Sequence, residues 1–262
     1  MTGKREKPKG PGPHTLAIDV GGTGIKASVL DVKGRMAAKR VRADTPHPLR
    51  SATLLHVIDG LTAGLPGFDR ISLGFPGVVR AGHVVTAPNL GTADWAGAPL
   101  ARQLSAHFQQ PARILNDADV QGLGIIKGQG VEMVITLGTG LGSSLFSDGQ
   151  IAPHLELAHM PFRKGLTFED YVCNAARKQV GRKTWNRRVR RIIETIRILV
   201  NFDTLHVGGG NAKHLRGDLP EGVILASNEA GIIGGLRLWD DKVWRLVPEG
   251  SLRSPFTLVR RS

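Results

Sequence analysis

A short apolar strand that runs into a glycine-rich turn and a returning strand occurs twice in this 262-residue chain. The first unit covers residues 16–30, and its turn reads Gly-Gly-Thr-Gly. The second covers residues 133–146, and its turn reads Gly-Thr-Gly-Leu-Gly. Each pattern predicts a β-hairpin. Because helical spacing also occurs in both halves, two related α/β lobes with a cleft between them fit the chain better than one uninterrupted sheet.

The spacing of apolar residues predicts the remaining elements. A helical period is found over residues 53–65, 100–108, 118–127, 167–180, 186–201 and 228–239. Short apolar runs predict strands over residues 71–75, 112–115 and 204–207. We therefore expect a disordered basic arm at 1–13, an N-terminal lobe at 14–117, a C-terminal lobe at 118–244 and a basic tail at 245–262.

The chain is strongly basic, with a formal net charge of +13. Lys and Arg are frequent in the first nine residues and in a second cluster, which consists of Arg182, Lys183, Arg187, Arg188, Arg190 and Arg191. Such a balance implies an anionic partner, such as nucleic acid, acidic lipid or a phosphate-rich substrate, or else a solvated basic surface. Nucleic acid is disfavoured, because aromatic residues make up only 5% and no recognised binding module is visible.

Composition excludes several other classes of protein. The one cysteine, Cys173, allows neither an intrachain disulfide nor a multi-cysteine metal site. No apolar stretch approaches the roughly 20 residues that span a bilayer. The basic N-terminus is not followed by an apolar core, so it does not read as a secretory signal. We expect a cytoplasmic protein that does not contact a membrane.

Three glycine-rich turns that follow strands are candidates for binding phosphate or nucleotide, because their backbone N–H groups are not screened by side chains. Their residues are Gly21, Gly22, Thr23, Gly138, Thr139, Gly140, Gly208, Gly209 and Gly210. The third of them, at 208–210, could let a nucleotide base or sugar lie against bare backbone. Lys26 adds positive charge near the first turn, and Asp19, just before it, can hold Mg²⁺. Each turn alone fits a plain tight turn, and none matches a P-loop or a dinucleotide fingerprint. Three in order, with Asp19 before the first, indicate a phosphate site.

A second candidate site lies at Asn116 and Asp117, where the strand predicted over 112–115 ends. An amide and a carboxylate at this place can bind a hydroxyl group and accept its proton. The same pair is also a common cap of a following helix. From the residues alone both interpretations stay open.

Eight segments, taken in order, resemble the ROK family of sugar kinases, and within it the polyphosphate glucokinases. They read DVGGTGIKASVLD, GFPGVV, APNL, LNDADVQGLG, TLGTGLGSSL, ELAH, HVGGGNAKH and NEAGIIGG, and they cover about residues 14–239. The resemblance implies the actin/hexokinase-like (ribonuclease H-like) α/β fold, with two lobes around a central cleft. It implies Asp117 as general base, and Asn89, Asn116, Glu156 and His159 as sugar-binding residues.

Two departures from the family pattern are visible. Many ROK kinases have Gly directly before the histidine of the E-x-x-H pair, whereas this chain has Ala158. Many also carry a cysteine-rich zinc motif soon afterwards. One cysteine cannot supply it, so we expect no structural zinc.

The activity that the resemblance implies is phosphorylation of glucose, or of mannose, at the 6-hydroxyl by polyphosphate, ATP or both, with Mg²⁺. It also suggests a homodimer. The basic cluster at 182–191 fits a polyphosphate track or a merely solvated helix face. Two alternatives stay open: an ATP-only hexose or N-acetylhexosamine kinase, and a non-catalytic sugar sensor. The intact Asp19, Asn116 and Asp117 argue against the sensor.

Overall fold

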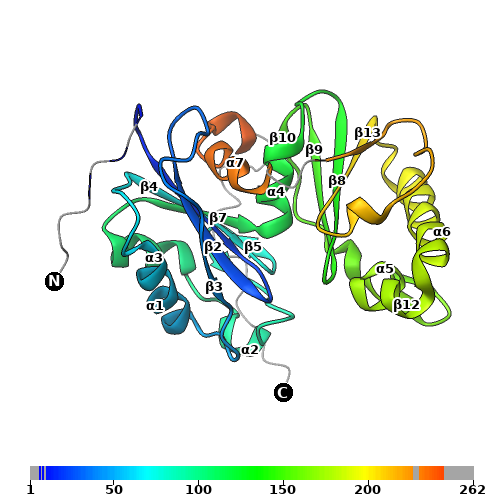
Figure 1. The fold of residues 1–262 in the computed structure, drawn as a ribbon, viewed down its shortest axis with the longest axis horizontal. Coiled ribbons are helices and arrows are strands. Elements are labelled where there is room, and N and C mark those ends of the chain that lie inside the picture. The colour runs from blue at the N-terminus through cyan, green and yellow to red at the C-terminus, as the bar shows by residue number, and fades with distance from the viewer. Residues whose placement is uncertain (1–5, 7, 9, 227–229, 245–262) are drawn as a thin grey trace, which may run out of the picture.

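Two five-stranded sheets with the same strand pattern organise the computed structural model, which describes residues 6, 8, 10–226 and 230–244. Each sheet has three antiparallel strands at one side and two parallel strands at the other. The sheets lie beside each other with helices between them and on their outer sides (Figure 1). The repeated hairpin of the sequence therefore marks a repeated sheet.

The first sheet has the strand order β3-β2-β1-β4-β7. Its strands are β1 (Thr15–Val20), β2 (Gly24–Leu30), β3 (Val41–Asp44), β4 (Arg70–Phe75) and β7 (Ala112–Asn116). β1, β4 and β7 are mutually parallel, so their carboxyl ends meet at one edge. This edge carries Asp19, the turn 21–23 and Asn116.

The second sheet has the strand order β10-β9-β8-β13-β14. Its strands are β8 (Val131–Leu137), β9 (Leu141–Ser147), β10 (Gln150–Ile151), β13 (Thr204–Gly208) and β14 (Val223–Leu225). β8 and β13 are parallel neighbours. The turn 138–140 and the turn 208–210, which follow these two strands, therefore lie side by side. Two small ribbons, β5 (Val79–Arg80) with β6 (His83–Val84) and β11 (Pro161–Arg163) with β12 (Leu166–Thr167), complete the strands.

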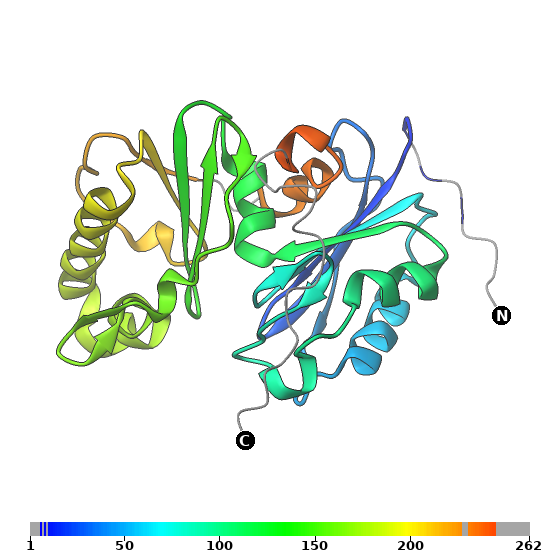
Figure 2. The same ribbon diagram turned by 180° about the vertical axis from the view of Figure 1, so that it is seen from behind.

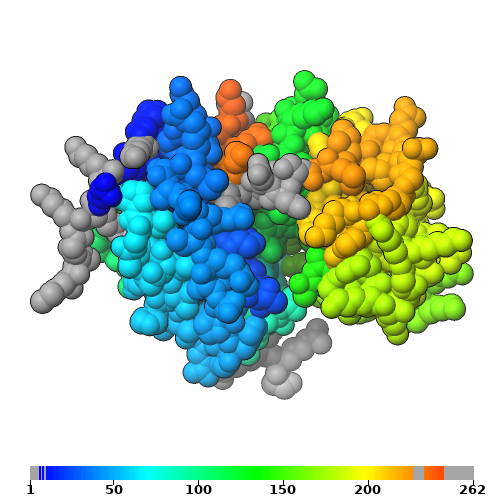
Figure 3. Space-filling view, in the orientation of Figure 1, coloured from blue at the N-terminus to red at the C-terminus, as the bar shows by residue number. Residues whose placement is uncertain are grey.

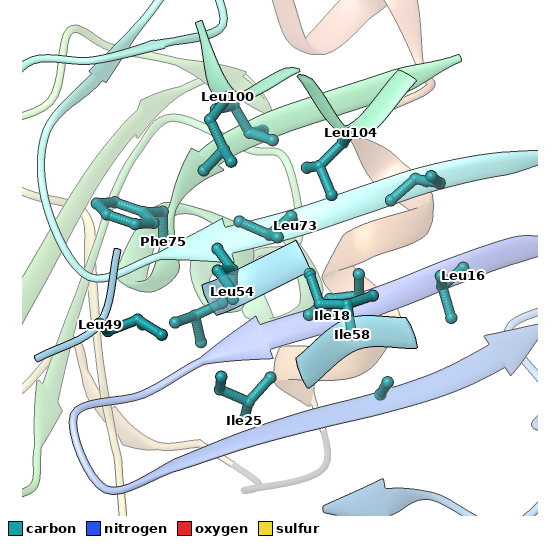
Figure 4. Packing of buried hydrophobic residues seen from close by; sticks show 14 of the residues in the cluster. Leu16, Ile18, Ile25, Leu49, Leu54, Ile58, Leu73, Phe75, Leu100 and Leu104 are labelled. Atoms are coloured by element: carbon teal, nitrogen blue, oxygen red, sulfur yellow. The ribbon is translucent and has the colours of Figure 1, made fainter. Parts of the chain in front are cut away.

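The core of the first half forms between one face of the first sheet and the helices α1 (Ser51–Thr62) and α3 (Leu100–Phe108). Figure 4 shows Leu54 and Ile58 of α1 and Leu104 of α3 above the strands. Alternation along β1 directs Leu16, Ile18 and Val20 to this core. The short helix α2 (Thr92–Trp95) adds the fully buried ring of Trp95.

The second half has a separate core, on the outer face of the second sheet, against α5 (Phe168–Val172) and α6 (Asn174–Val200). Helix α6 directs Trp185, Val189 and Ile192 to the sheet, and its basic residues lie on other faces. A capping box between Thr167 and Asp170 begins α5. Three 3₁₀ turns, η1 (Leu157–His159), η2 (Ala212–His214) and η3 (Asp241–Trp244), complete the structure.

Helices α4 (Asp117–Ile125) and α7 (Ala230–Arg237) lie between the two sheets, as Figure 2 shows from behind. Glycine permits their close contact. A Cβ on Gly234 of α7 would clash with the carbonyl of Val120 in α4. Glycine also lets α4 approach the second sheet, because a Cβ on Gly122 would clash with Ser144 and Phe146 of β9. Residues 230–237 also reach the first sheet, where Ser72 Oγ donates to the carbonyl of Gly235 at 2.6 Å.

The predicted hairpins, the strands and the helices over 53–65, 100–108 and 118–127 are confirmed to within a few residues. The predicted break between the helices at 167–180 and 186–201 is confirmed within α6, where Gly181 has the non-helical angles φ 74° and ψ 162°. The prediction missed a second break at Cys173, which separates α5 from α6. The edge strands β3, β10 and β14 were not predicted, because they are short and partly exposed.

Of the predicted arm, the structure describes residues 6, 8 and 10–13, and the carbonyl of Pro11 accepts a hydrogen bond from Val32 N at 3.4 Å. The predicted basic tail at 245–262 and the start of the helix predicted from 228 lie outside the described residues. Within the described part, no helix is both long and apolar enough to cross a membrane.

Candidate active site

Asp117 lies where β7 ends and α4 begins. Asn116 is the N-cap of α4, and its Oδ1 accepts the amides of Ala118 at 2.7 Å and Asp119 at 3.3 Å. Its Nδ2 donates to the carbonyl of Gly77 at 3.1 Å. The helix cap, one of the two interpretations that the sequence left open, is therefore present. It holds Asp117 in the first turn of the helix.

Burial raises the pKa of Asp117 to about 7, and the nearby charge of Asp19 adds to this effect. The amide of Ala118, which donates to Asp117 Oδ1 at 2.9 Å, opposes it. The two carboxylates approach because β1 and β7 flank β4, where a Cβ on Gly74 would lie 3.2 Å from Asp117 Cα. A carboxylate with a pKa near neutrality suits a general base.

The first glycine turn follows Asp19. Its backbone is held by the segment after β3, because Thr45 Oγ1 donates to the carbonyl of Gly21 at 2.6 Å and His47 Nε2 lies 3.0 Å from that of Gly22. A Cβ on Gly22 would meet nothing within 4 Å, so the turn borders open space. Lys26 Nζ pairs with Asp19 Oδ2 at 3.0 Å, so these two candidates are brought together.

The second and third glycine turns meet at the end of the second sheet. The carbonyl of Gly138 accepts the amide of Asn174, at the start of α6, and Asn211 Nδ2, each at 3.0 Å. Gly209 has φ 84° and packs on the backbone of Leu137. Gly138 and Gly210 border open space and Thr139 is exposed, whereas Gly140 lies near Glu169, whose carboxylate accepts the amide of Leu141 at 3.0 Å.

A hollow separates the two halves of the molecule in the space-filling view (Figure 3). Asp117 begins helix α4, which lies between the two sheets. Asn89 is exposed in the turn after β6. The residues just before it, Thr86 and Ala87, pack against Gly77, whose carbonyl accepts from Asn116. Glu156 and His159 bound the turn η1, where the amide of His159 donates to the carbonyl of Glu156 at 3.1 Å.

Two residues that sequence reasoning missed connect these parts. His154 Nδ1 lies 3.0 Å from Asp119 Oδ2, and His154 Nε2 lies 3.5 Å from Glu156 Oε1. Burial alone lowers the pKa of His154, but the hydrogen bonds to Asp119 and Glu156 outweigh it and raise that pKa to about 10. The only sequence signals were that Asp119 follows Asp117 by two positions and that His154 precedes Glu156 by two.

The donor set at the edge of the first sheet suits Mg²⁺, which is usually held by one or two carboxylates, water and substrate phosphates. The Asp19 side chain is 38% exposed, and its negative charge contributes to the raised pKa of Asp117. Among the residues that the structure describes, no three His, Cys, Asp or Glu side chains form a metal-binding group. Asp19 could hold a bound Mg²⁺ together with water and phosphate oxygens.

The basic cluster at 182–191 divides into two sets. Arg182, Arg188 and Arg190 donate to the carbonyls of His214, Tyr171 and Asp218, and so tie α6 to neighbouring segments. Lys183, Arg187 and Arg191 are exposed at intervals of four residues and form one row on the helix.

Solved structures of sugar kinases share this fold. The inorganic polyphosphate/ATP-glucomannokinase from Arthrobacter sp. strain KM matches with a TM-score of 0.76 and 29% identity, over 86% of this chain and 97% of that chain. A ROK family glucokinase from Streptomyces griseus, in complex with glucose and AMPPNP, matches with a TM-score of 0.71 and 20% identity, over 86% and 98% of the two chains. The predicted actin/hexokinase-like fold is confirmed, and the class is that of the sugar kinases.

The narrower assignment comes from sequence. The model of the ROK family matches residues 15–178. The polyphosphate glucokinase of Mycobacterium tuberculosis is 28% identical over 238 residues, which cover 84% of this chain and 89% of the relative. The chain belongs to the ROK family, and it is a sugar kinase of the glucokinase type.

Proposed function

We propose that this kinase transfers a phosphoryl group from polyphosphate or ATP to the 6-hydroxyl of glucose in the cytoplasm, with Mg²⁺. The observation that carries the proposal is the Asp117 carboxylate, whose pKa is raised to about 7 beside Asp19 and the first glycine turn. A base must sit next to the phosphate site for in-line transfer, and the parallel strands β1 and β7 supply both at one edge.

In this mechanism Asp117 Oδ2 accepts the proton of the sugar hydroxyl, because Oδ1 already accepts the amide of Ala118. Asn116 has committed its oxygen to two amides and one N–H to Gly77, so one N–H remains for a sugar oxygen. Glu156, His159 and Asn89 bind the other hydroxyls. When bound, Mg²⁺ neutralises charge on the transferred phosphate, and Asp19 is the carboxylate placed to hold it.

The donor is proposed from two features. The open turns at Gly22, Gly138 and Gly210 can receive phosphate oxygens on backbone amides. The exposed row Lys183, Arg187 and Arg191 suits an extended polyanion better than a single nucleotide. Relatives named for polyphosphate, and one named for both polyphosphate and ATP, support a chain that uses one or both donors.

The test is formation of glucose 6-phosphate with polyphosphate and ATP supplied separately. Asp117→Asn should lower kcat by about 10²- to 10⁴-fold, whereas Asp241→Asn, at a side chain that is 91% exposed, should leave it unchanged. Mannose and N-acetylhexosamines in the same assay define the sugar. Turnover with ATP alone would overturn polyphosphate use, and glucose binding without turnover of any sugar would favour the sensor.

A further inference from the structure

A buried imidazole joins two carboxylates from different segments of the second half. Asp119 comes from the first turn of α4, His154 from the stretch after β10, and Glu156 from the start of η1. The side chains of Asp119 and His154 are 3% and 7% exposed, and that of Glu156 is 31% exposed. The contacts thus run from the buried Asp119 carboxylate to the partly exposed Glu156 carboxylate.

The chemistry of the three groups defines their charge state. Burial raises the pKa of Asp119, and its hydrogen bond with His154 opposes that rise. An ionised carboxylate can only accept hydrogen bonds, so an imidazole with an ionised carboxylate at each nitrogen donates from both nitrogens. His154 is then an imidazolium, which its raised pKa supports. Its charge in turn holds the pKa of Glu156 below its usual range, because Glu156 accepts from the ring.

This arrangement is a poor device for stability alone. Among the described residues, Asp119 Oδ1 is buried and has no hydrogen-bond partner. A buried ionic group with an unsatisfied oxygen is usually less stable than an apolar replacement. A contrast is the pair His206 and Glu132, 2.9 Å apart, where the carboxylate also accepts the amides of Lys127, Gly128 and Gln129. Glu132 thus stabilises the turn at residues 127–129, whereas His154 contacts a second carboxylate, that of Glu156.

We propose that Asp119 and His154 are positioning residues for sugar recognition, which fix the Glu156 carboxylate relative to Asp117. Asp119 and Asp117 lie in the same first turn of α4, so the contacts of His154 link the helix turn that carries the base to the loop that carries Glu156. The loop has other tethers, such as Ser143 Oγ to the carbonyl of Leu155 at 2.7 Å, but they hold its backbone. His154 orients the carboxylate. This inference rests on the proposed sugar-kinase reaction.

Loss of His154 should weaken glucose binding more than phosphoryl transfer. In His154→Asn the Glu156 carboxylate loses its cationic partner, so KM for glucose should rise by about 10- to 100-fold. Because Glu156 contacts the sugar in the ground state and the transition state alike, kcat should change much less. KM for the phosphoryl donor should stay within about twofold.

The experiment compares His154→Asn and Asp119→Asn with the matched control His206→Asn, which breaks a buried histidine–carboxylate pair elsewhere. Kinetics with glucose are combined with thermal unfolding and with ¹⁵N NMR of the wild-type histidine rings at pH 8. We expect all three variants to lose stability, only the first two to raise the KM for glucose, and His154 to carry both ring protons.

An unchanged KM for glucose in His154→Asn, or an equal rise in His206→Asn, would overturn the proposal. A neutral His154 ring at pH 8 would also overturn it, and this readout needs no variant to fold. If the wild-type protein phosphorylates no sugar, the proposed function fails instead, and glucose affinity by calorimetry then tests the positioning role by itself.

Discussion

The surroundings of the Asp117 carboxylate shift its pKa in opposite directions. The N-terminus of α4 favours a negative charge through the oriented peptide dipoles and the amide of Ala118. Burial and the charge of Asp19 oppose ionisation more strongly, and the result is a pKa of about 7. The group is therefore about half ionised at neutral pH, where it can both accept and release a proton.

The pH dependence of the reaction follows from this value. Only the ionised Asp117 can accept the hydroxyl proton, so kcat/KM for glucose should rise with pH and level off above about 7. It should fall by about tenfold for each pH unit below that value. Asp19→Asn should move the inflection to lower pH, because it removes a neighbouring negative charge, even where the rate is reduced. An inflection near pH 4 in the wild type would contradict the assignment.

His154 predicts a second pH effect, on stability. Its pKa in the folded protein, about 10, lies above the value of 6.5 for the free side chain. The stabilisation from its charge is therefore complete below about pH 6.5 and is lost as the pH rises toward 10. Between pH 7 and 10 the Tm of the wild type should fall more than that of His154→Asn. Parallel curves in thermal scans would argue against a charged ring.

At the scale of elements, the contact between α4 and α7 depends on glycine. A Cβ on Gly234 would clash with the carbonyl of Val120 and lie 2.9 Å from Gly124 N. Gly234→Ala should therefore lower the free energy of unfolding by about 1–3 kcal/mol. Gly60 lies in α1, and a Cβ there would meet nothing within 4 Å. Gly60→Ala should raise stability by about 0.5–1 kcal/mol. Urea unfolding measures both, and a loss at Gly60 as large as at Gly234 would contradict this account.

Helix α6 offers a test of the donor. Replacement of Lys183, Arg187 and Arg191 with Gln should raise KM for polyphosphate by roughly tenfold, since exposed charges contribute modestly. KM for ATP should stay within about twofold, and the difference should shrink at high salt. The matched control replaces Lys39, Arg40 and Arg80, which are exposed on the first half. Equal rises in the KM for polyphosphate in the two triple variants would assign the effect to net charge rather than to this row of residues.

At the scale of the whole molecule, α7 returns from the second half to the first sheet. Ser72 Oγ donates to the carbonyl of Gly235 and accepts from Trp239 Nε1 at 2.9 Å. Ser72→Ala leaves both partners without this hydroxyl, so the free energy of unfolding should fall by about 1–3 kcal/mol. Urea denaturation followed by circular dichroism measures the change. An unaltered unfolding midpoint would show that this contact does not hold α7 on the sheet.

The hairpins of both sheets could be predicted from residue order, because alternation of apolar residues and the glycine turns are local properties. The strand β3 could not, since Val41–Asp44 is short and gains its hydrogen bonds only from β2. The break at Cys173 was missed for a related reason. At this residue ψ is 169°, and the Cys173 side chain caps α6 by accepting the amide of Ala176, whereas neither Gly nor Pro marks the break in the sequence.

For the candidate site, the sequence by itself determined the chemical groups: the glycine turns, the Asn116-Asp117 pair at a strand end, and the family to which their order belongs. Only the tertiary structure decided their properties. Asp19 acts on the pKa of Asp117 because parallel strands bring the two carboxylates together, and the pKa of His154 is raised because α4 and η1 place a carboxylate near each ring nitrogen. Burial and charge–charge energies depend on distance in space, which residue order does not record.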